Sequence, residues 1–217
     1  MHLPRTHPGV RLPPDSIADL GQTPAELVIL CTGDSHLSLL AEVARQLPAD
    51  YPGLRLASPA QLANHASVDR YVEQVLQHAR VVLVSVHGGV SYWRYGIERL
   101  VALARQGLTL ILVPGDDRPD PELTALGTVS SADSEQLWQY LRQGGAGNAR
   151  QLFAFLGSRW LGRSEPWQPP RPLPRALIPP PGPRASALAP RQPPRPPARP
   201  GAPPLLYRTP PQAAHPA

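Results

Sequence analysis

Lysine is missing from this chain, in which all 21 basic residues are arginines. Without lysine the chain cannot contain a P-loop of the Gly-x4-Gly-Lys-Ser/Thr type, a Schiff-base residue or a lysine nucleophile. If the protein takes part in ATP hydrolysis, we therefore expect a different subunit to bind the nucleotide.

Cysteine and long apolar runs are also scarce. The single Cys31 excludes an internal disulfide, and the sequence has no Cys-x-x-Cys pair or His-Glu-x-x-His spacing for a structural or hydrolytic zinc site. The longest apolar stretches, at 81–86 and 108–113, are too short to cross a bilayer, and residues 1–16 lack the apolar core of a signal peptide. These features predict a protein of the reducing cytoplasm with no membrane partner.

The basic excess of the chain lies in its last quarter. Residues 1–163 contain 14 arginines and 15 acidic residues, whereas residues 164–217 contain 7 arginines and one glutamate. The second segment also holds 20 of the 31 prolines, which remove backbone donors and disfavour helix and central strand alike. We predict a head domain over 1–163 and a disordered Pro/Arg-rich tail over 164–217. The low aromatic content of the tail argues against a stacking platform for single strands, and we expect no nucleic-acid partner.

Apolar strands alternate with amphipathic helices through the head. Strands are expected at 25–32, 54–58, 80–86 and 108–115, and helical segments at 35–47, 59–79, 91–106, 131–143 and 146–161. Asp34 or Ser35 is the expected cap of the first helix. Ser58 and Gln61 form a capping box for the second, which is expected to break at 64–67. This order predicts an α/β fold with an open, mostly parallel sheet and helices on both faces, as in flavodoxin-like and Rossmann-like proteins. The last two helices form a helical pair that follows the sheet.

A double-glycine turn joins the third expected strand to an aromatic helix start. The strand ends at His87-Gly88-Gly89, and Ser91 is a fair N-cap for the helix that follows. Ligands of open α/β sheets bind at the carboxyl ends of the strands. We therefore expect this turn to lie beside the polar loop 114–120 at the end of the fourth strand.

Several segments, in order, resemble one family. They are LGQTPAELVIL at 20–30, HASVDRYVEQVLQHARVV at 65–82, GGVSYWRYGIE at 88–98, PGDDRPDPEL at 114–123 and WLGRSEPWQPPRPLPRA at 160–176. Together they are similar to the N-terminal part of the large subunit of aerobic cobaltochelatase, the CobN family, which is related to the large subunit of magnesium chelatase. The resemblance carried by these motifs runs from residue 1 to about 175.

This resemblance implies a part in the ATP-dependent insertion of cobalt into hydrogenobyrinic acid a,c-diamide, during aerobic cobalamin biosynthesis. In the family the large subunit, a ligase-type metal chelatase, holds the tetrapyrrole, and two smaller subunits form the ATPase. Family members are several times longer, so we expect this chain to be inactive alone. The alternative is a freestanding flavodoxin-like binding module with a partner-recruiting tail. We interpret the tail after about 175 as a shifted or truncated reading frame, and the alternatives are a native polyproline arm or an electrostatic tether for nucleic acid.

Four residues are candidates for the tetrapyrrole surface. His87 is placed to ligate a metal or the edge of the macrocycle, or it is a loop histidine bonded to backbone or water. Tyr92, Trp93 and Arg94 offer a flat face and a cation, or the aromatic residues pack and anchor the helix start. No catalytic residue, metal ligand or cofactor bound by the chain itself is identified.

Two further groups favour ordinary structural roles. Asp116, Asp117 and Asp120 cluster in a loop that is strong turn sequence, so turn and cap chemistry explains them better than cation binding. Cys31 ends a strand, and a buried, inert thiol is favoured over a nucleophile.

Overall fold

Continuous β-branched and apolar runs become the buried strands of a parallel sheet in the computed structural model, which describes residues 17–172. The strands are β1 (Leu27–Cys31), β2 (Leu54–Ala57), β3 (Val81–Val86) and β4 (Thr109–Pro114), in the order β2-β1-β3-β4. All three pairs are parallel, and the register places Cys31 beside Ser85 and Ser85 beside Val113. The predicted parallel α/β sheet is confirmed.

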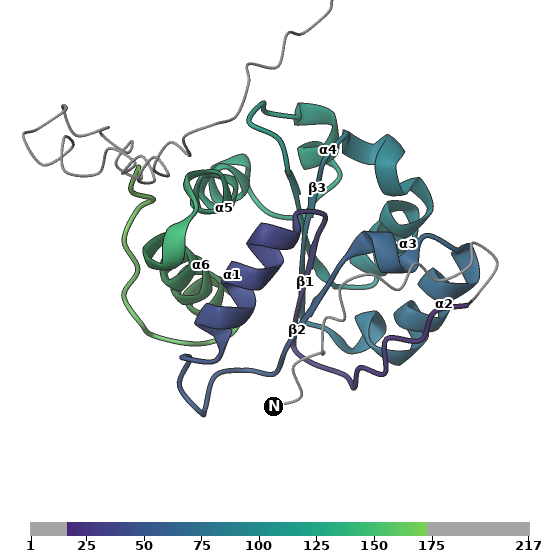
Figure 1. Ribbon diagram of the computed structural model, residues 1–217, viewed down its shortest axis with the longest axis horizontal. Helices are drawn as coiled ribbons and strands as arrows, with labels where there is room; N and C mark the ends of the chain where they lie inside the picture. Colours follow the sequence, from purple (N-terminus) through teal and green to yellow (C-terminus); the bar gives the residue numbers. More distant parts are fainter. Residues whose placement is uncertain (1–16, 173–217) are drawn as a thin grey trace, which may run out of the picture. The chain divides into compact units, whose positions relative to one another are not determined.

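Six α-helices cover the two faces of this sheet (Figure 1). One face packs on α1 (Asp34–Ala44), α5 (Ser131–Gln143) and α6 (Gly145–Trp160), and the other on α2 (His65–Gln74), α3 (Arg94–Ala104) and α4 (Pro121–Ala125). Alternate strand residues divide between the two cores, with Leu27 and Ile29 in the first and Val28 and Leu30 in the second. Among residues 17–172, no helix is long and apolar enough to span a membrane.

Short 3-10 helices account for most differences from the expected elements. They are η1 (Pro59–Leu62), η2 (Leu76–His78) and η3 (Gly89–Trp93). The capping box of Ser58 and Gln61 forms as expected but begins η1, and Asn64 then caps α2. Thus the helical region from 59 to 79 is broken at the point where its polar residues predicted a break.

The predicted cap at Ser91 is wrong, because residues 89–93 form η3 and α3 begins only at Arg94. Trp93 leaves helical geometry, with φ −141° and ψ 47°, and its indole N–H donates to the carbonyl of Leu62 at 3.0 Å. The hydrogen bond of this buried indole N–H thus determines the residue at which α3 begins. Similarly, α1 begins after Gly33 without a side-chain cap, so neither Asp34 nor Ser35 caps it.

Both edges of the sheet are covered by hydrogen bonds from neighbouring loops. At β4, Thr128 N donates to Leu110 O at 2.8 Å, and Leu110 N donates to Thr128 Oγ1 at 2.9 Å. At β2, the Gln22 amide donates to Leu56 O at 3.0 Å. Such coverage leaves less edge for pairing with another chain.

Residues 164–172, expected as the beginning of the disordered tail, pack along α5 and α6 (Figure 1). Asn148 exchanges two hydrogen bonds with the backbone of Arg171, at 2.8 and 2.9 Å, and Tyr140 Oη donates to Gln168 O at 2.5 Å. Trp167 meets Phe155 edge to face. Side chains of α5 and α6 thus form hydrogen bonds with the backbone of this proline-rich segment, which forms no helix or strand of its own. The predicted tail beyond 172 lies outside the described residues.

Candidate functional site

The side on which the next strand is added to the sheet changes between β1 and β3, which makes their carboxyl ends the topological switch point of the sheet. From β1 the chain passes through α1 to β2 on one side, and from β3 it passes through α3 to β4 on the other. Open α/β sheets bind ligands in the crevice outside such a point. His87 directly follows β3 and therefore lies at this crevice.

His87 is held by the loop that follows β1. Thr32 Oγ1 lies 2.5 Å from His87 Nδ1 and accepts a hydrogen bond from His87 N at 3.1 Å. The loop after β4 comes equally close, because a Cβ atom on Gly115 would lie 2.9 Å from both His87 N and Nδ1. Only glycine permits this approach. The loops of three neighbouring strands therefore meet at His87, and the expected proximity of 87–89 to 114–120 is confirmed.

A second imidazole, His36 in the first turn of α1, lies at the same crevice. A Cβ on Gly33 would lie 3.2 Å from His36 Nδ1 and 3.7 Å from His87 Cε1, so the two rings flank Gly33. Burial, and then the charge of His87, lower the pKa of His36, so its imidazole is neutral at neutral pH. A neutral imidazole can accept a proton or ligate a metal.

Sequence reasoning missed His36 as a site residue. The sequence did contain a signal for His36: this residue lies five positions after the end of β1, in the first turn of the helix that follows. Cys31 Sγ lies 4.0 Å from His36 Nδ1, and burial raises the pKa of this thiol. The interpretation of Cys31 as a buried, inert thiol agrees with its 1% exposure.

The acidic loop mainly organises the backbone. Asp116 Oδ2 accepts a hydrogen bond from Gly88 N at 3.1 Å, and Asp120 caps α4 by accepting from Leu123 N at 3.0 Å. Asp117 faces Arg142 at 4.0 Å. The cap interpretation is confirmed for Asp120, whereas Asp116 bonds the backbone of the distant double-glycine turn. In the described part of the chain, no three His, Cys, Asp or Glu side chains lie close enough together to hold a metal ion.

The remaining predicted surface residues surround a separate cavity of about 240 Å³ beside η3, which we call the aromatic hollow. Trp93 is 6% exposed and anchors the helix start, as the packing alternative predicted, whereas Tyr92 is 50% exposed and Arg94 is also exposed. The rings of Tyr95 and His65 are stacked, with their centroids 4.0 Å apart. The hollow is lined by Pro59, Ala60, Leu62, Ala63, His65, Val68, Tyr92, Trp93, Arg94 and Tyr95.

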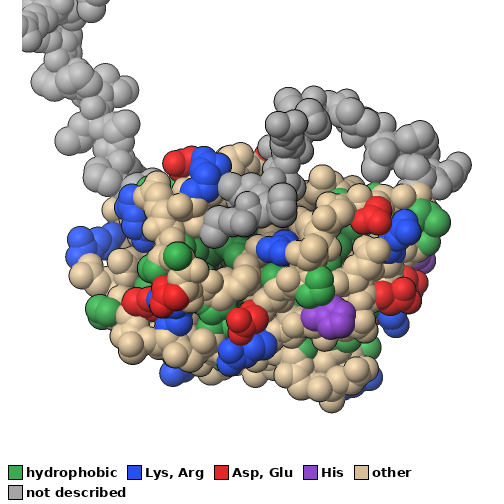
Figure 2. Space-filling model, turned by 90° about the horizontal axis from the view of Figure 1, so that it is seen from below, with side chains coloured by type: hydrophobic (Ala, Val, Ile, Leu, Met, Phe, Trp, Pro, Cys, Tyr) green, Lys and Arg blue, Asp and Glu red, His purple; other side chains and the backbone are tan. Residues whose placement is uncertain are grey.

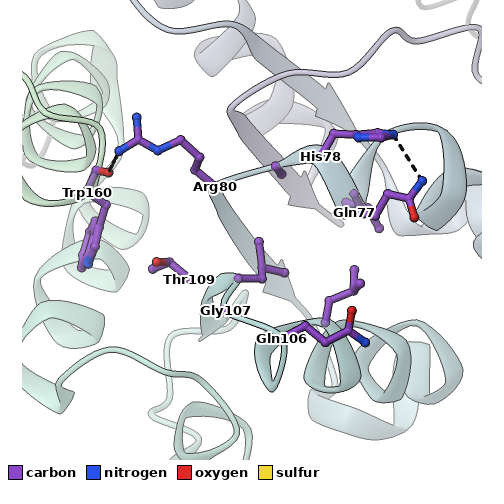
Figure 3. Close-up of a pocket in the computed structure, with 11 residues that line it drawn as sticks. Gln77, His78, Arg80, Gln106, Gly107, Thr109 and Trp160 are labelled. Carbon is purple, nitrogen blue, oxygen red and sulfur yellow. Dashed lines mark hydrogen bonds between the residues drawn. The ribbon is translucent and has the colours of Figure 1, made fainter.

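A larger cavity of about 710 Å³ lies near the amino ends of β3 and β4 (Figure 3). Arg80 at its border donates to Trp160 O at 3.1 Å and pairs with Glu26 at 2.9 Å, so its charge is already compensated. Figure 2 shows arginines and acidic side chains interspersed over one face of the molecule.

Comparison with known proteins gives consistent matches. The chain is 58% identical over its 217 residues to the aerobic cobaltochelatase subunit CobN of Pseudomonas aeruginosa, of which it covers 17%. It is 37% identical over 179 residues to CobN of Sinorhizobium sp, covering 82% of this chain and 14% of that protein. No family model matches the chain.

The catalytic subunit of cobaltochelatase from Mycobacterium tuberculosis has a similar structure. It aligns with a TM-score of 0.56 and 28% identity over 68% of this chain and 11% of that chain. The three matches confirm the resemblance to the cobaltochelatase large subunit that the sequence motifs carry. The chain spans about a sixth of the length of the curated relatives it matches, 17% and 14%.

The match to the Pseudomonas protein covers 100% of this chain and so includes residues 176–217. The resemblance therefore extends past residue 175, where the motifs placed its end. A shifted reading frame is not expected to align with a homologue, so the match argues against that interpretation of the tail.

Proposed function

We propose that this chain forms the N-terminal head of the large subunit of an aerobic cobaltochelatase. In this role it takes part in ATP-dependent cobalt insertion into hydrogenobyrinic acid a,c-diamide, a step of cobalamin biosynthesis in the cytoplasm. The observation that carries the proposal is the 58% identity to CobN over the whole chain. The similar structure of the Mycobacterium catalytic subunit supports it.

The chemistry of metal insertion explains why we expect the head to be inactive alone. Water must be stripped from Co²⁺, the macrocycle must bend, and two pyrrolic protons must be removed by bases. These steps need a cavity with metal ligands and bases around the tetrapyrrole, whereas no three His, Cys, Asp or Glu side chains among the described residues lie close enough together to hold a metal ion. We infer that the rest of the large subunit completes the site and that two smaller partner subunits bind ATP, consistent with a chain that has no lysine.

Within the head, His87 is the predicted tetrapyrrole contact that the fold supports best. It lies at the switch point, its Nδ1 is engaged by Thr32, and the neutral His36 lies beside it. A histidine fixed through one ring nitrogen presents the other in a defined direction. We therefore place the contact with the macrocycle at His87.

A chimera tests the proposed function. The part of Pseudomonas aeruginosa CobN that matches this chain is replaced by residues 1–217, and cobalamin-dependent growth is measured in cells that lack their own CobN. We expect growth with the chimera and none when the same part is deleted. A chimera that accumulates to normal levels without supporting growth would contradict the proposal.

Binding by the isolated chain tests the expectation that the head is inactive alone. Hydrogenobyrinic acid a,c-diamide is titrated into residues 1–217, and its absorption spectrum is followed. We expect no saturable change at micromolar protein. Tight binding or cobalt insertion by the chain alone would show that the head does not depend on the rest of the subunit.

A further inference from the structure

The Thr32 hydroxyl lies between two backbone groups and the ring of His87. Its oxygen accepts a hydrogen bond from His87 N at 3.1 Å, and it lies 3.4 Å from Ser85 O, which as a carbonyl oxygen can only accept. The third neighbour is His87 Nδ1, at 2.5 Å. A hydroxyl group has one proton to donate and two lone pairs with which to accept. These three neighbours therefore match the full hydrogen-bonding capacity of Thr32.

The number of protons available at Thr32 decides the tautomer of His87. Ser85 O accepts from Thr32 N at 3.1 Å and has a second lone pair for the Thr32 hydroxyl proton. With that proton donated and one lone pair accepting from His87 N, the other lone pair of Thr32 accepts from a proton on Nδ1. In the opposite tautomer Thr32 would donate to Nδ1, and its contact with Ser85 O would be lost. Every group is paired only when His87 carries its proton on Nδ1.

This tautomer leaves Nε2 as the chemically active nitrogen of His87. The ring is exposed, and none of residues 17–172 forms a hydrogen bond with Nε2. Nε2 then has a lone pair and no proton, so it can accept a proton but cannot donate a hydrogen bond to a carboxylate. Gly115 limits the ring from another side, since a Cβ atom there would lie 2.9 Å from Nδ1. The switch-point crevice is thus offered a base in a defined direction.

We propose that Thr32 is a positioning residue for His87, and that His87 Nε2 takes up one of the pyrrolic protons during cobalt insertion. This inference rests on the proposed function, which supplies the tetrapyrrole and the metal. The N–H bond of a pyrrolic nitrogen breaks, its electron pair stays on that nitrogen for cobalt, and the proton forms a bond to Nε2. The resulting imidazolium still donates its Nδ1–H to Thr32, so the ring keeps its orientation.

His36, the other imidazole of the crevice, is less suited to this role. It is partly buried, and its Nδ1 lies 4.0 Å from the Cys31 thiol. Burial lowers the pKa of His36, so its ring holds an added proton less readily. Proton uptake is therefore assigned to His87.

NMR of the full chain with isotope-labelled histidine measures the tautomer of His87, at a pH at which the imidazoles are neutral. Long-range proton–nitrogen correlations identify the ring nitrogen that carries the proton. We expect the Nδ1–H tautomer in the unaltered chain, a measurement that needs neither a variant nor a substrate. Thr32→Val should shift His87 toward the Nε2–H tautomer, because valine cannot accept from Nδ1, and Thr32→Ser should restore Nδ1–H. An Nε2–H tautomer in the unaltered chain, or no shift in Thr32→Val, would overturn the inference.

The rate of cobalt insertion by a purified chimera, in which residues 1–217 replace the matching part of Pseudomonas aeruginosa CobN, tests the chemical role. Thr32→Val is expected to lower kcat at least about tenfold and to leave the KM for Co²⁺ unchanged, since a positioned base contributes roughly 10²–10⁴-fold. Thr32→Ser should recover most of the rate. Thr124→Val is the matched control, because the Thr124 hydroxyl also bonds a backbone oxygen, Asp120 O at 2.8 Å, and forms no hydrogen bond with His87.

Equal rates for Thr32→Val and the unaltered chimera, or an equal loss in Thr124→Val, would overturn the inference while the proposed function stands. A chimera that is inactive with Thr32 in place would instead contradict the proposed function. The tautomer measured in the chain alone then decides the positioning role of Thr32 by itself.

Discussion

Replacing Gly96 by alanine should destabilise the protein, although alanine is normally favoured over glycine in a helix. A Cβ atom on Gly96 would overlap three atoms of the Trp93 ring, which packs directly on the α3 backbone. The indole must then leave a site where it is 6% exposed and bonded to Leu62 O. Loss of a buried Trp side chain lowers the free energy of unfolding by about 3–5 kcal/mol, and the higher helix propensity of alanine offsets about 1 kcal/mol of this. We expect Gly96→Ala to lower the free energy of unfolding by about 2–4 kcal/mol.

A double-mutant cycle, measured by urea unfolding of the full chain, isolates this contact. Without the indole in a Trp93→Ala background, Gly96→Ala should stabilise the protein by about 0.5–1 kcal/mol. Gly147→Ala is the control, since a Cβ there meets nothing within 4 Å. Stabilisation by Gly96→Ala in the presence of Trp93, or the same effect in both backgrounds, would refute the reasoning.

Three further variants test the crevice and the packing of residues 164–172. The pKa of His36 is lowered from 6.5 in the folded chain, so the unfolded chain takes up a proton at this residue at a higher pH than the folded chain does. The stability of the fold therefore falls as the pH drops below 6.5. His36→Gln should flatten the pH dependence of the urea midpoint, and an unchanged profile would contradict this. Asn148→Ala should cost about 1–3 kcal/mol and speed amide exchange at 168–171, where unaltered exchange would count against the hydrogen bonds. Thr32→Val should change the NMR signals and mobility of the His87 ring, and identical spectra would argue against the contact.

The sequence could predict what depends on local pattern. The apolar runs at 81–86 and 108–113 identify buried strands, and the alternation of strands with helices places His87 at the carboxyl edge of a parallel sheet. The break near Asn64 was equally visible, because its side chain caps the next helix without help from distant residues.

Features that depend on distant partners could not be predicted in the same way. The late start of α3 follows from the hydrogen bond between Trp93 and Leu62, which are 31 residues apart. His36 joins the site only because α1 docks over the ends of β1 and β3. The proline-rich segment 164–172 is bonded by Asn148 and Tyr140, whose partners no local pattern reveals. The five-residue helix α4 is too short to give a periodic signal.

The most direct test of the central claim is the rate of cobalt insertion by purified CobN whose matching part has been replaced by residues 1–217. The assay contains the ATPase subunits, ATP, Co²⁺ and hydrogenobyrinic acid a,c-diamide. We predict ATP-dependent insertion by the chimera and none by residues 1–217 alone. A folded, assembled chimera with no insertion activity would contradict the assignment of this chain as the head of a cobaltochelatase large subunit.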